Sequence, residues 1–497
     1  MLARVRVLPL AWVLLACRTT ADEPLPRATA GAPAATELAV GRPSPIEHET
    51  QHAETKAQIE IAAQPASRIS TTPYTPASTL GEPIAIYRAS LPRPIFDEPS
   101  VKAPLRGRIE MSESFHVYAL RSGVNGDGCS LAWAQVADAG WICTKHTKTD
   151  EHAKPHELPV LPKHKLLPFL YARHARHDDP SAPKLPVFRH LTALRDGADP
   201  VDWLAAYGTY AFVRKARSGK QSVLIDARGR VVPATDMRTL DPSEFGGRDL
   251  TLAPVPDEQQ LAWVIDRKTG VYAQPDPGSE RRPLAYHAEL LVVDQREIGS
   301  DRASWIRVPA SEGFAEGWIP AAHVRIWRPL APPEPLLAGQ TLIDVDLDQQ
   351  VLTLWEEDRP VFATLIASGK PGHSTPTGLY RIITKRAYGK MASLPTEADP
   401  YWVDAVPWTM YFDGRFALHG AFWHDRFGYR SSHGCVNLSP RDAKLLFDRS
   451  TPTLPAGWLI VNEHASDPGT LVRIHKGNPN VPDRRGASLD DAALEDD

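Results

Sequence analysis

Proline is the residue that most constrains the fold of this chain. It occupies 47 of the 497 positions, about twice its usual frequency. Because proline cannot donate a backbone hydrogen bond and clashes inside helices, long helices cannot recur along such a chain. Hydrophobic residues make up 42% of the sequence, which is enough for packed cores. We therefore expect a mainly β protein of several domains, built from short strands and turns.

The balance of charge argues against a nucleic acid partner. The formal net charge is −4 and the isoelectric point is about 6.5. Proteins that bind nucleic acid without another signal need a clear excess of lysine and arginine. We therefore expect no nucleic acid partner.

The first 17 residues predict export. Arg4 and Arg6 precede an apolar run from Val7 to Ala16, which is too short to cross a bilayer as a stable helix and is typical of a signal peptide. The run ends in Leu-Leu-Ala-Cys17, which resembles a lipobox, so that Cys17 would be lipidated and become the mature N-terminus. An ordinary signal peptide, cleaved without lipid attachment, is the alternative. We expect an exported protein of the periplasm or cell envelope, anchored to a membrane by lipid.

Two segments have the composition of disordered chain. Residues 18–80 are rich in Ala, Thr, Pro and Glu, and residues 476–497 are polar and acidic. Neither segment has enough apolar surface to offset the entropy of ordering. We predict a flexible linker at residues 18–80 and a disordered acidic tail at residues 476–497.

Residues 81–150 and 261–330 resemble each other. Each has a Trp-x-x-Val strand followed by Gly-Trp-Ile, at residues 133–136 and 140–142 in the first copy and 305–308 and 317–319 in the second. Short alternating strands with this ending resemble bacterial SH3-like β-barrel domains. Such domains bind peptide or glycan in some wall-associated proteins, and a purely structural spacer role stays open here.

The cysteines fall into three groups. Cys129 and Cys143 flank the Trp-x-x-Val strand of the first copy, so in an oxidising compartment we expect them to form a disulfide, worth about 3 kcal/mol for a loop of about fifteen residues. With Cys17 lipidated, Cys435 is left as the free thiol.

The segment between the two copies, residues 151–260, begins with a histidine-rich linker. Its histidines are His152, His156, His164, His174 and His177. Their spacing could place pairs of imidazoles together, but no cysteine and no convincing third ligand joins them, and prolines interrupt any helix. We expect no metal site. A small β-rich domain follows, to which the sequence assigns no role.

Local patterns after residue 331 predict strands and one helix. Alternation over Leu342–Leu347 places Ile343, Val345 and Leu347 on one face of a strand, and the short strands with tight turns that follow favour a β-sandwich. An Asp413-Gly414 turn predicts a hairpin whose second strand ends near His419. Ser439 followed by Pro440 predicts a helix start, with Ala443, Leu446 and Phe447 as its apolar face.

Candidate chemistry gathers around Cys435. His433 lies two positions before it, Gly434 separates the two, and His419 lies sixteen positions before it. A thiol attacks well only as a thiolate, so a catalytic cysteine needs an imidazole that takes its proton and later returns it. Gly434 suits a tight backbone whose N–H groups face a developing oxyanion.

The spacing of these residues resembles a known signature. His419-Gly420, followed after eleven residues by Ser-His-Gly-Cys435-Val-Asn437, is similar to the active site of the YkuD-type L,D-transpeptidase catalytic domain, a family that crosslinks bacterial peptidoglycan. Thr375-Pro-Thr-Gly378 resembles a second signature of that family, with a structural role. The resemblance covers roughly residues 338–475 and implies a catalytic domain at residues 331–475.

The resemblance implies a role for each motif residue. Cys435 would be the nucleophile and His419 the base. The pocket and oxyanion site would be shaped by Ser432, His433, Gly434 and Asn437. Four further residues close in sequence are candidates for substrate contact, although aromatic residues in a sandwich more often belong to the core: Met410, Tyr411, Trp423 and His424. No metal or organic cofactor is needed, and a carbapenem should acylate Cys435.

The function that follows is peptidoglycan L,D-transpeptidation. An acyl-enzyme formed on the cysteine from a stem tetrapeptide would be transferred to an amine of another stem. Water as the acceptor would make the protein an L,D-carboxypeptidase, and an amine of a wall protein would make it an attachment enzyme. A rival of another class is a non-catalytic wall-binding lipoprotein. A general cysteine protease is disfavoured, because no papain-like pattern surrounds the cysteine.

Overall fold

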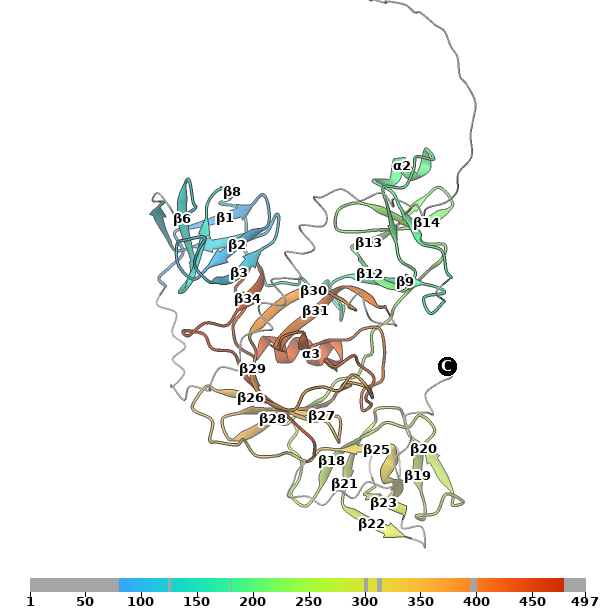
Figure 1. Ribbon diagram of the computed structural model, residues 1–497. Coiled ribbons are helices and arrows are strands. Elements are labelled where there is room, and N and C mark those ends of the chain that lie inside the picture. Colours follow the sequence, from blue (N-terminus) through green and yellow to red (C-terminus); the bar gives the residue numbers. More distant parts are fainter. Residues whose placement is uncertain are drawn as a thin grey trace, which may run out of the picture. The chain divides into compact units, whose positions relative to one another are not determined.

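The structure is a computed structural model that describes residues 80–123, 127–179, 181–298, 303–310, 315–393 and 400–477 (Figure 1). The expected signal peptide with Cys17, nearly all of the linker and nearly all of the acidic tail lie outside these residues. Strands dominate the described chain, which confirms the mainly β expectation. Its helices are α2 (Leu191–Arg195), α3 (Pro440–Asp448) and the 3-10 turn η1 (Ala321–His323). None of the described helices has the length and apolar character needed to span a bilayer.

Three successive segments of the chain each form a module of eight strands. Module 1 contains β1 (Ala85–Ala89), β2 (Arg93–Phe96), β3 (Leu105–Ile109), β4 (Ser114–Val117), β5 (Ala119–Ser122), β6 (Ala132–Ala137), β7 (Gly140–Cys143) and β8 (Thr147–Thr149). Module 2 contains β9 (Leu170–His174), β10 (Leu185–Val187), β11 (Asp202–Leu204), β12 (Gly208–Phe212), β13 (Arg214–Ser218), β14 (Gln221–Ile225), β15 (Val231–Pro233) and β16 (Met237–Thr239). Module 3 contains β18 (Gln260–Val264), β19 (Gly270–Tyr272), β20 (Arg281–Pro283), β21 (Glu289–Val292), β22 (Asp294–Ile298), β23 (Ala303–Val308), β24 (Gly317–Pro320) and β25 (Val324–Ile326).

The three modules share one scheme of strand pairing. In each, the first strand pairs with the fourth and the eighth, the second pairs with the third, and the sixth pairs with the fifth and the seventh. The second and seventh strands also meet, through β2 and β7, through β19 and β24, and in module 2 through a bridge between Phe188 and Val231. Module 2, in which the sequence showed only a small β-rich domain, therefore has the topology of the other two. The described pairings leave the sheets open, and the resemblance to SH3-like barrels stays a prediction.

Module 2 escaped recognition because it lacks both tryptophans of the repeated pattern. The register places Val223 opposite Pro233, as Trp305 lies opposite Pro320 in module 3. Likewise Val231 lies opposite Ile225, as Trp318 lies opposite Arg307 in module 3. A weaker signal was present in the sequence, since residues 233–238 and 320–325 both read Pro-Ala-x-x-apolar-Arg.

In module 1 the sulfurs of Cys129 and Cys143 are bonded to each other, with their Cα atoms 5.6 Å apart. Both cysteines are buried beside Trp133, next to Phe96. Trp133 makes an edge-to-face contact with Phe96, with ring centroids 6.0 Å apart. The disulfide thus joins the segment before β6 to the end of β7, beside the aromatic cluster of the module.

The C-terminal domain, residues 340–477, consists of two packed sheets and α3. Its strands are β26 (Thr341–Asp346), β27 (Val351–Glu356), β28 (Arg359–Leu365), β29 (Gly378–Arg381), β30 (Thr384–Ala392), β31 (Trp402–Asp413), β32 (Phe416–Gly420), β33 (Val436–Leu438), β34 (Trp458–Asn462) and β35 (Leu471–His475). One sheet has the order β28-β27-β26-β35-β29, and the other contains β34, β30, β31, β32 and β33. Apolar residues of both sheets and of α3 form a single core.

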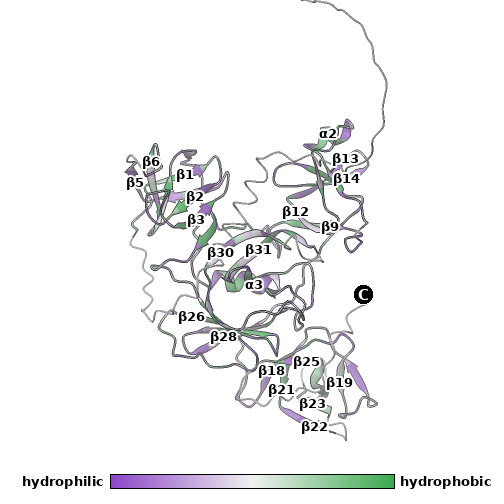
Figure 2. Ribbon diagram, in the orientation of Figure 1, coloured by the Kyte–Doolittle hydropathy of each residue, from purple (hydrophilic) through white to green (hydrophobic). Residues whose placement is uncertain are grey.

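The local predictions for this domain are confirmed. Ile343, Val345 and Leu347 lie in the core, as the alternation of β26 requires. α3 begins after Ser439, whose side chain accepts a hydrogen bond from the N–H of Asp442. Figure 2 shows α3 with both apolar and polar residues, and its apolar residues Ala443, Leu446 and Phe447 are buried. The amphipathic helix thus fills the space beside the sheet of β31 and β32.

Module 2 is joined to the C-terminal domain by backbone pairing and by aromatic stacking. β12 runs parallel to β31, with Gly208 opposite Trp402 and Thr209 opposite Val403. Tyr171 of β9 donates its hydroxyl hydrogen to the carbonyl of Ala405 at 2.6 Å. Its ring also stacks on Phe422 with 3.7 Å between centroids.

The segment between modules 2 and 3 is bound to the C-terminal domain by a buried carboxylate. Its short strand β17 (Arg248–Asp249) pairs with β28. Asp442 of α3 accepts a hydrogen bond from the N–H of Gly247 at 3.0 Å and another from the hydroxyl of Thr364 at 2.5 Å. Burial raises the pKa of Asp442 to about 6, while the hydroxyl of Thr364 and the N–H of Gly247 act in the opposite direction.

Candidate active site

The two strands that carry the predicted catalytic residues are neighbours. β31 and β32 form the expected hairpin, and β32 pairs with the parallel strand β33 so that His419 lies opposite Asn437. Cys435 comes directly before β33. Because side chains alternate along a strand, Cys435 and Asn437 project to the same side, which is also the side of His419. Pairing in the sheet therefore brings together residues that are sixteen positions apart in sequence.

The loop before Cys435 is held by hydrogen bonds from the Thr-Pro-x-Gly turn. The hydroxyl of Thr375 donates to the carbonyl of Gly434 at 2.8 Å and accepts from the N–H of Gly369 at 3.0 Å. The hydroxyl of Ser432 donates to the carbonyl of Cys435 at 2.6 Å and accepts from the N–H of Gly434 at 3.1 Å. Thr375 and Ser432 are buried, so these bonds fix the backbone on both sides of Cys435.

Gly434 has a backbone conformation that other residues rarely adopt. Its φ is +112°, and a Cβ atom added there would lie 2.5 Å from the ring of Phe416. Glycine is therefore required at this position both by the backbone and by the close approach of the ring.

The thiol of Cys435 is surrounded by protein yet partly accessible. Its Sγ lies 3.8 Å from the carbonyl oxygen of Arg415, to which the S–H donates. Burial raises the pKa of the Cys435 thiol to about 11, although the N–H of Ala417 and the charge of Arg415 lower it. The thiol is therefore protonated at neutral pH in the absence of substrate.

His419 is buried with its Nδ1 atom 3.4 Å from the carbonyl oxygen of Gly420. A neutral imidazole must donate at that atom, which leaves the lone pair on Nε2 to accept a proton. Burial lowers the pKa of His419 to about 4. Trp423 stacks on the imidazole with 5.7 Å between ring centroids, which restrains the ring.

These two pKa values predict a neutral resting pair. The imidazole loses its proton above a pH of about 4 and the thiol keeps its proton up to a pH of about 11, so neither group is charged between these limits. We expect the thiolate absorbance near 240 nm, measured against a Cys435→Ala blank, to be absent at pH 7 and to grow only as the pH approaches 11. A full thiolate signal at pH 7 would instead reveal a resting thiolate–imidazolium pair.

A second histidine, His424, which is partly buried, determines how Asn437 is oriented. The Nδ1 atom of His424 accepts a hydrogen bond from the N–H of Arg426 at 3.1 Å. Burial, followed by the charges of His419 and Arg426, lowers the pKa of His424 to about 3, so its ring is neutral and its proton is on Nε2. That Nε2 lies 2.8 Å from the amide of Asn437. The Asn437 atom that faces it must therefore be the oxygen, since two donors cannot bond to each other.

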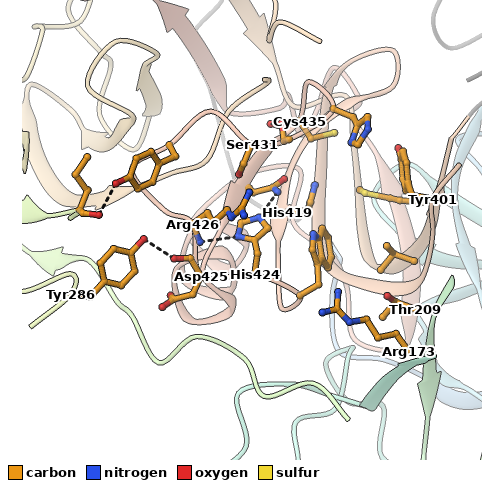
Figure 3. Close-up of a pocket in the computed structure, with 18 of the residues that line it drawn as sticks. Arg173, Thr209, Tyr286, Tyr401, His419, His424, Asp425, Arg426, Ser431 and Cys435 are labelled. Atoms are coloured by element: carbon orange, nitrogen blue, oxygen red, sulfur yellow. Dashed lines mark hydrogen bonds between the residues drawn. The ribbon is translucent and has the colours of Figure 1, made fainter. Parts of the chain in front are cut away.

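Cys435 and His419 open into a cavity of about 900 Å³ (Figure 3). The C-terminal domain lines it with Met391, Tyr401, Trp402, Val403, His419, Trp423, His424, Asp425, Arg426, Tyr429, Ser431, Ser432, His433, Cys435 and Asn437. Module 2 contributes Arg173, Tyr207 and Thr209, and module 3 contributes Ile265, Asp266, Arg267, Lys268, Tyr286 and Arg325. The site is therefore built by three parts of the chain, which no local sequence pattern indicated.

Of the four residues that were expected to contact substrate, the structure places two in the wall of the cavity. Trp423 and His424 line the cavity. Met410 is fully buried in the core of the domain, and Tyr411 does not line the cavity. The reason is the alternation along β31, which directs Met410 toward the packed sheets.

His433 lies on the wall of the cavity between two other rings. Its centroid is 4.7 Å from that of His373 and 4.9 Å from that of Tyr401. Through this packing, His433 forms part of the cavity wall that also contains Cys435. Tyr401 precedes β31 and had no signal in the sequence.

The histidine-rich linker shows no metal arrangement within the described ranges, where no three His, Cys, Asp or Glu side chains gather as ligands. Three of its histidines have other contacts. The Nε2 of His156 lies 3.5 Å from a carboxylate oxygen of Glu113. His174 is buried and accepts a hydrogen bond from the N–H of Arg176, and His177 lies 2.9 Å from Asp178.

Solved structures of L,D-transpeptidases are similar to part of the chain. The enzyme of Xylanimonas cellulosilytica is 24% identical over 30% of this chain and 65% of its own length, with a TM-score of 0.21. The enzyme of Stackebrandtia nassauensis is 23% identical over 31% of this chain and 60% of its own length, with a TM-score of 0.21. The catalytic domain of the E. faecium enzyme is 25% identical over 28% of this chain and 98% of its own length, with a TM-score of 0.23. The chain thus spans less than two thirds of the first two of these proteins.

Comparison with protein families gives a match confined to the C-terminal domain. No curated protein sequence is similar enough to this chain to count as a match. The family model of the L,D-transpeptidase catalytic domain, YkuD, matches residues 340–474. This range includes β26 to β34, all of β35 except His475, and the residues Thr375, His419 and Cys435. By these residues the C-terminal part of the chain belongs to the L,D-transpeptidase catalytic domain family.

Proposed function

We propose that this protein is a cysteine-dependent peptidoglycan L,D-transpeptidase of the cell envelope. It forms an acyl-enzyme from the stem tetrapeptide of one strand and transfers the acyl group to an amine of another stem. One observation carries the proposal: a free thiol and a buried neutral imidazole project from adjacent strands into a single cavity large enough for a peptide. Export and a lipid on Cys17 remain part of this proposal.

The first half of the reaction forms a thioester. His419 Nε2 takes the thiol proton while the sulfur of Cys435 attacks the stem carbonyl carbon, and the carbonyl oxygen becomes an oxyanion. When this intermediate collapses, the carbon–nitrogen bond breaks and His419 gives its proton to the departing amine of the terminal amino acid. Proton transfer occurs during attack rather than before it, because both groups are neutral at rest.

The oxyanion is stabilised by the backbone beside the nucleophile. The N–H of Gly434 already bonds the hydroxyl of Ser432. The N–H of Cys435 is therefore the donor that we assign to the oxyanion, with Gly434 providing the turn that aims it.

The second half of the reaction releases the enzyme. An amine of a second stem attacks the thioester carbon, His419 takes a proton from that amine, and the thiolate leaves and regains the proton from His419. The product is a peptide crosslink and free Cys435. Water in place of the amine would instead release a tripeptide.

The test is mass spectrometry of muropeptides after the purified protein has been incubated with a disaccharide tetrapeptide. We expect crosslinked dimers from the wild type and none from Cys435→Ala, and we expect a carbapenem such as ertapenem to add covalently only to the wild type. Tripeptide without dimer would move the assignment to L,D-carboxypeptidase. If neither product nor adduct depends on Cys435, the proposal is wrong and the wall-binding alternative is favoured.

A further inference from the structure

The cavity carries more positive than negative charge. Five of its lining residues are cationic, namely Arg173, Arg267, Lys268, Arg325 and Arg426, and two are acidic, namely Asp266 and Asp425. Arg267 bonds Asp425, and Arg325 bonds the carbonyl of Gly428. A cavity of this composition favours an anionic ligand.

Arg173 differs from the other cations of the cavity. It is half-buried on β9 of module 2, and burial is the main cause that lowers the pKa of its guanidinium. No hydrogen bond or ion pair of its guanidinium is described, whereas Arg267 and Arg325 both have partners. The side chains of Lys268 and Arg426 also have no described partner, but these two residues are exposed to solvent. A half-buried guanidinium facing a cavity without a bonded anion is a binding group for a carboxylate.

The charges around Arg173 are not balanced. The strand pairing places Arg238 of β16 directly opposite it, and Thr209 of β12 opposite it on the other side. Two arginines facing each other across a strand pair repel. The negative charge of Asp178 raises the pKa of Arg173. However, a carboxylate oxygen of Asp178 already lies 2.9 Å from Nε2 of His177. A bound anion would relieve this repulsion.

Strand pairing connects Arg173 to the C-terminal domain. Thr209, which lies opposite Arg173, is paired with Val403, and Val403 is paired with Met391, so one continuous row of residues crosses from module 2 into the C-terminal domain. Arg173, Thr209, Val403 and Met391 all line the cavity. Figure 3 shows Arg173 and Thr209 reaching the same pocket as His419 and Cys435.

Aromatic packing links the same strand to the catalytic histidine. Tyr171, two residues before Arg173 and thus on the same face of β9, stacks on Phe422. Phe422 is in contact with Trp423, with 4.9 Å between centroids, and Trp423 stacks on His419. Module 2 therefore packs against the segment that carries His419 and forms one wall of the cavity.

From this arrangement we propose that Arg173 is a substrate-binding residue, supplied by module 2, that pairs with a carboxylate of a peptidoglycan stem and so selects acidic stems. This inference rests on the proposed function and goes beyond it, because it assigns to module 2 a direct part in specificity. The carboxylate belongs either to the donor stem or to the acceptor stem, and the chemistry of the contact is the same in both.

The experiment compares Arg173→Gln with the matched control Arg238→Gln. Both substitutions remove one positive charge from facing positions on β9 and β16, but Arg238 is exposed and does not line the cavity. Steady-state kinetics with the disaccharide tetrapeptide should show KM raised about ten- to a hundred-fold by Arg173→Gln, with kcat changed much less. Arg238→Gln should change KM less than threefold, or about 0.65 kcal/mol at most.

A second arm identifies the carboxylate. The stems are amidated at one carboxylate at a time. Amidation of the recognised carboxylate should weaken binding to the wild type by the same factor as the Arg173→Gln substitution does. The same amidation should not weaken binding to the variant any further. A rise of KM for formation of the acyl-enzyme places the carboxylate on the donor, and a rise confined to the dependence on acceptor concentration places it on the acceptor. Alkylation of Cys435 by neutral iodoacetamide should be equally fast in wild type and variant.

Three outcomes would overturn the inference. If Arg173→Gln matches the wild type, or if Arg238→Gln raises KM equally, Arg173 has no specific contact. If iodoacetamide reacts more slowly with Arg173→Gln, its effect is structural. A wild type that turns over no stem at all would refute the proposed function itself, whereas active wild type with an unaffected variant refutes this inference alone.

Discussion

Replacing His419 with glutamine should slow acylation of Cys435 by ertapenem about a thousand-fold at pH 7, within the range typical of general base catalysis. With a thiol pKa of about 11, only a very small fraction of Cys435 is thiolate at neutral pH. In the proposed mechanism, the wild type avoids this limit by moving the proton to the imidazole of His419 during attack. Without the imidazole, reaction depends on the free thiolate.

The same variant should change the shape of the pH profile. For the wild type, the acylation rate should stay flat between about pH 5 and 9, because His419 loses its proton near pH 4 and the thiol keeps its proton to about 11. For His419→Gln, the rate should rise about tenfold per pH unit over this range, since the thiolate fraction rises by that factor. Mass spectrometry of the adduct at fixed times measures both profiles.

The control for this experiment is His433→Gln. His433 is nearer to Cys435 in sequence and also lines the cavity, but its ring packs against His373 and Tyr401. We expect a smaller loss and an unchanged flat profile. A larger loss with His433→Gln, or a flat profile for His419→Gln, would mean that the base has been assigned to the wrong histidine.

Replacing Gly434 with alanine should reduce the rate of acylation at least about a hundred-fold and lower the free energy of unfolding by about 1 to 3 kcal/mol. The added methyl group would require a φ of +112° and would lie 2.5 Å from the ring of Phe416. Relief of this contact moves the backbone that carries the thiol and its N–H group. Thermal unfolding and the ertapenem reaction measure the two effects separately.

Two further variants separate the causes of that loss. Gly229 also has a positive φ, +77°, but a Cβ atom there would meet nothing within 4 Å, so Gly229→Ala should leave acylation unchanged. Adding Phe416→Ala to Gly434→Ala removes the steric contact but leaves the backbone strain. Full acylation by Gly434→Ala alone would show that the tight approach to Phe416 does not position the nucleophile.

Prediction from the sequence was most successful where the interactions are local. A hairpin needs only its turn residues, and the Asp413-Gly414 turn correctly placed His419 near the end of a strand. The cap at Ser439 and the apolar face of α3 depend on residues within one or two helical turns, and both were predicted. The motif spacing indicated the family of the C-terminal domain, which is confirmed for residues 340–474.

The repeated modules show where sequence patterns no longer reveal a shared fold. Modules 1 and 3 share tryptophans that make their similarity visible, whereas module 2 keeps the strand pairing and has Val223 and Val231 instead. A strand accepts many apolar side chains at a buried position, so topology persists after the recognisable residues have changed.

What the sequence by itself indicated is a candidate nucleophile, a candidate base, the glycine next to the thiol and the kind of fold that presents them, because each is encoded by neighbouring residues or by a fixed spacing. Only the tertiary structure decided the walls of the active site. Arg173 is 262 positions from Cys435 in sequence, and it reaches the same cavity because β12 pairs with β31 and Tyr171 stacks on Phe422. Contacts of this kind depend on how whole sheets pack, and packing of distant surfaces leaves no periodic signal in a single chain.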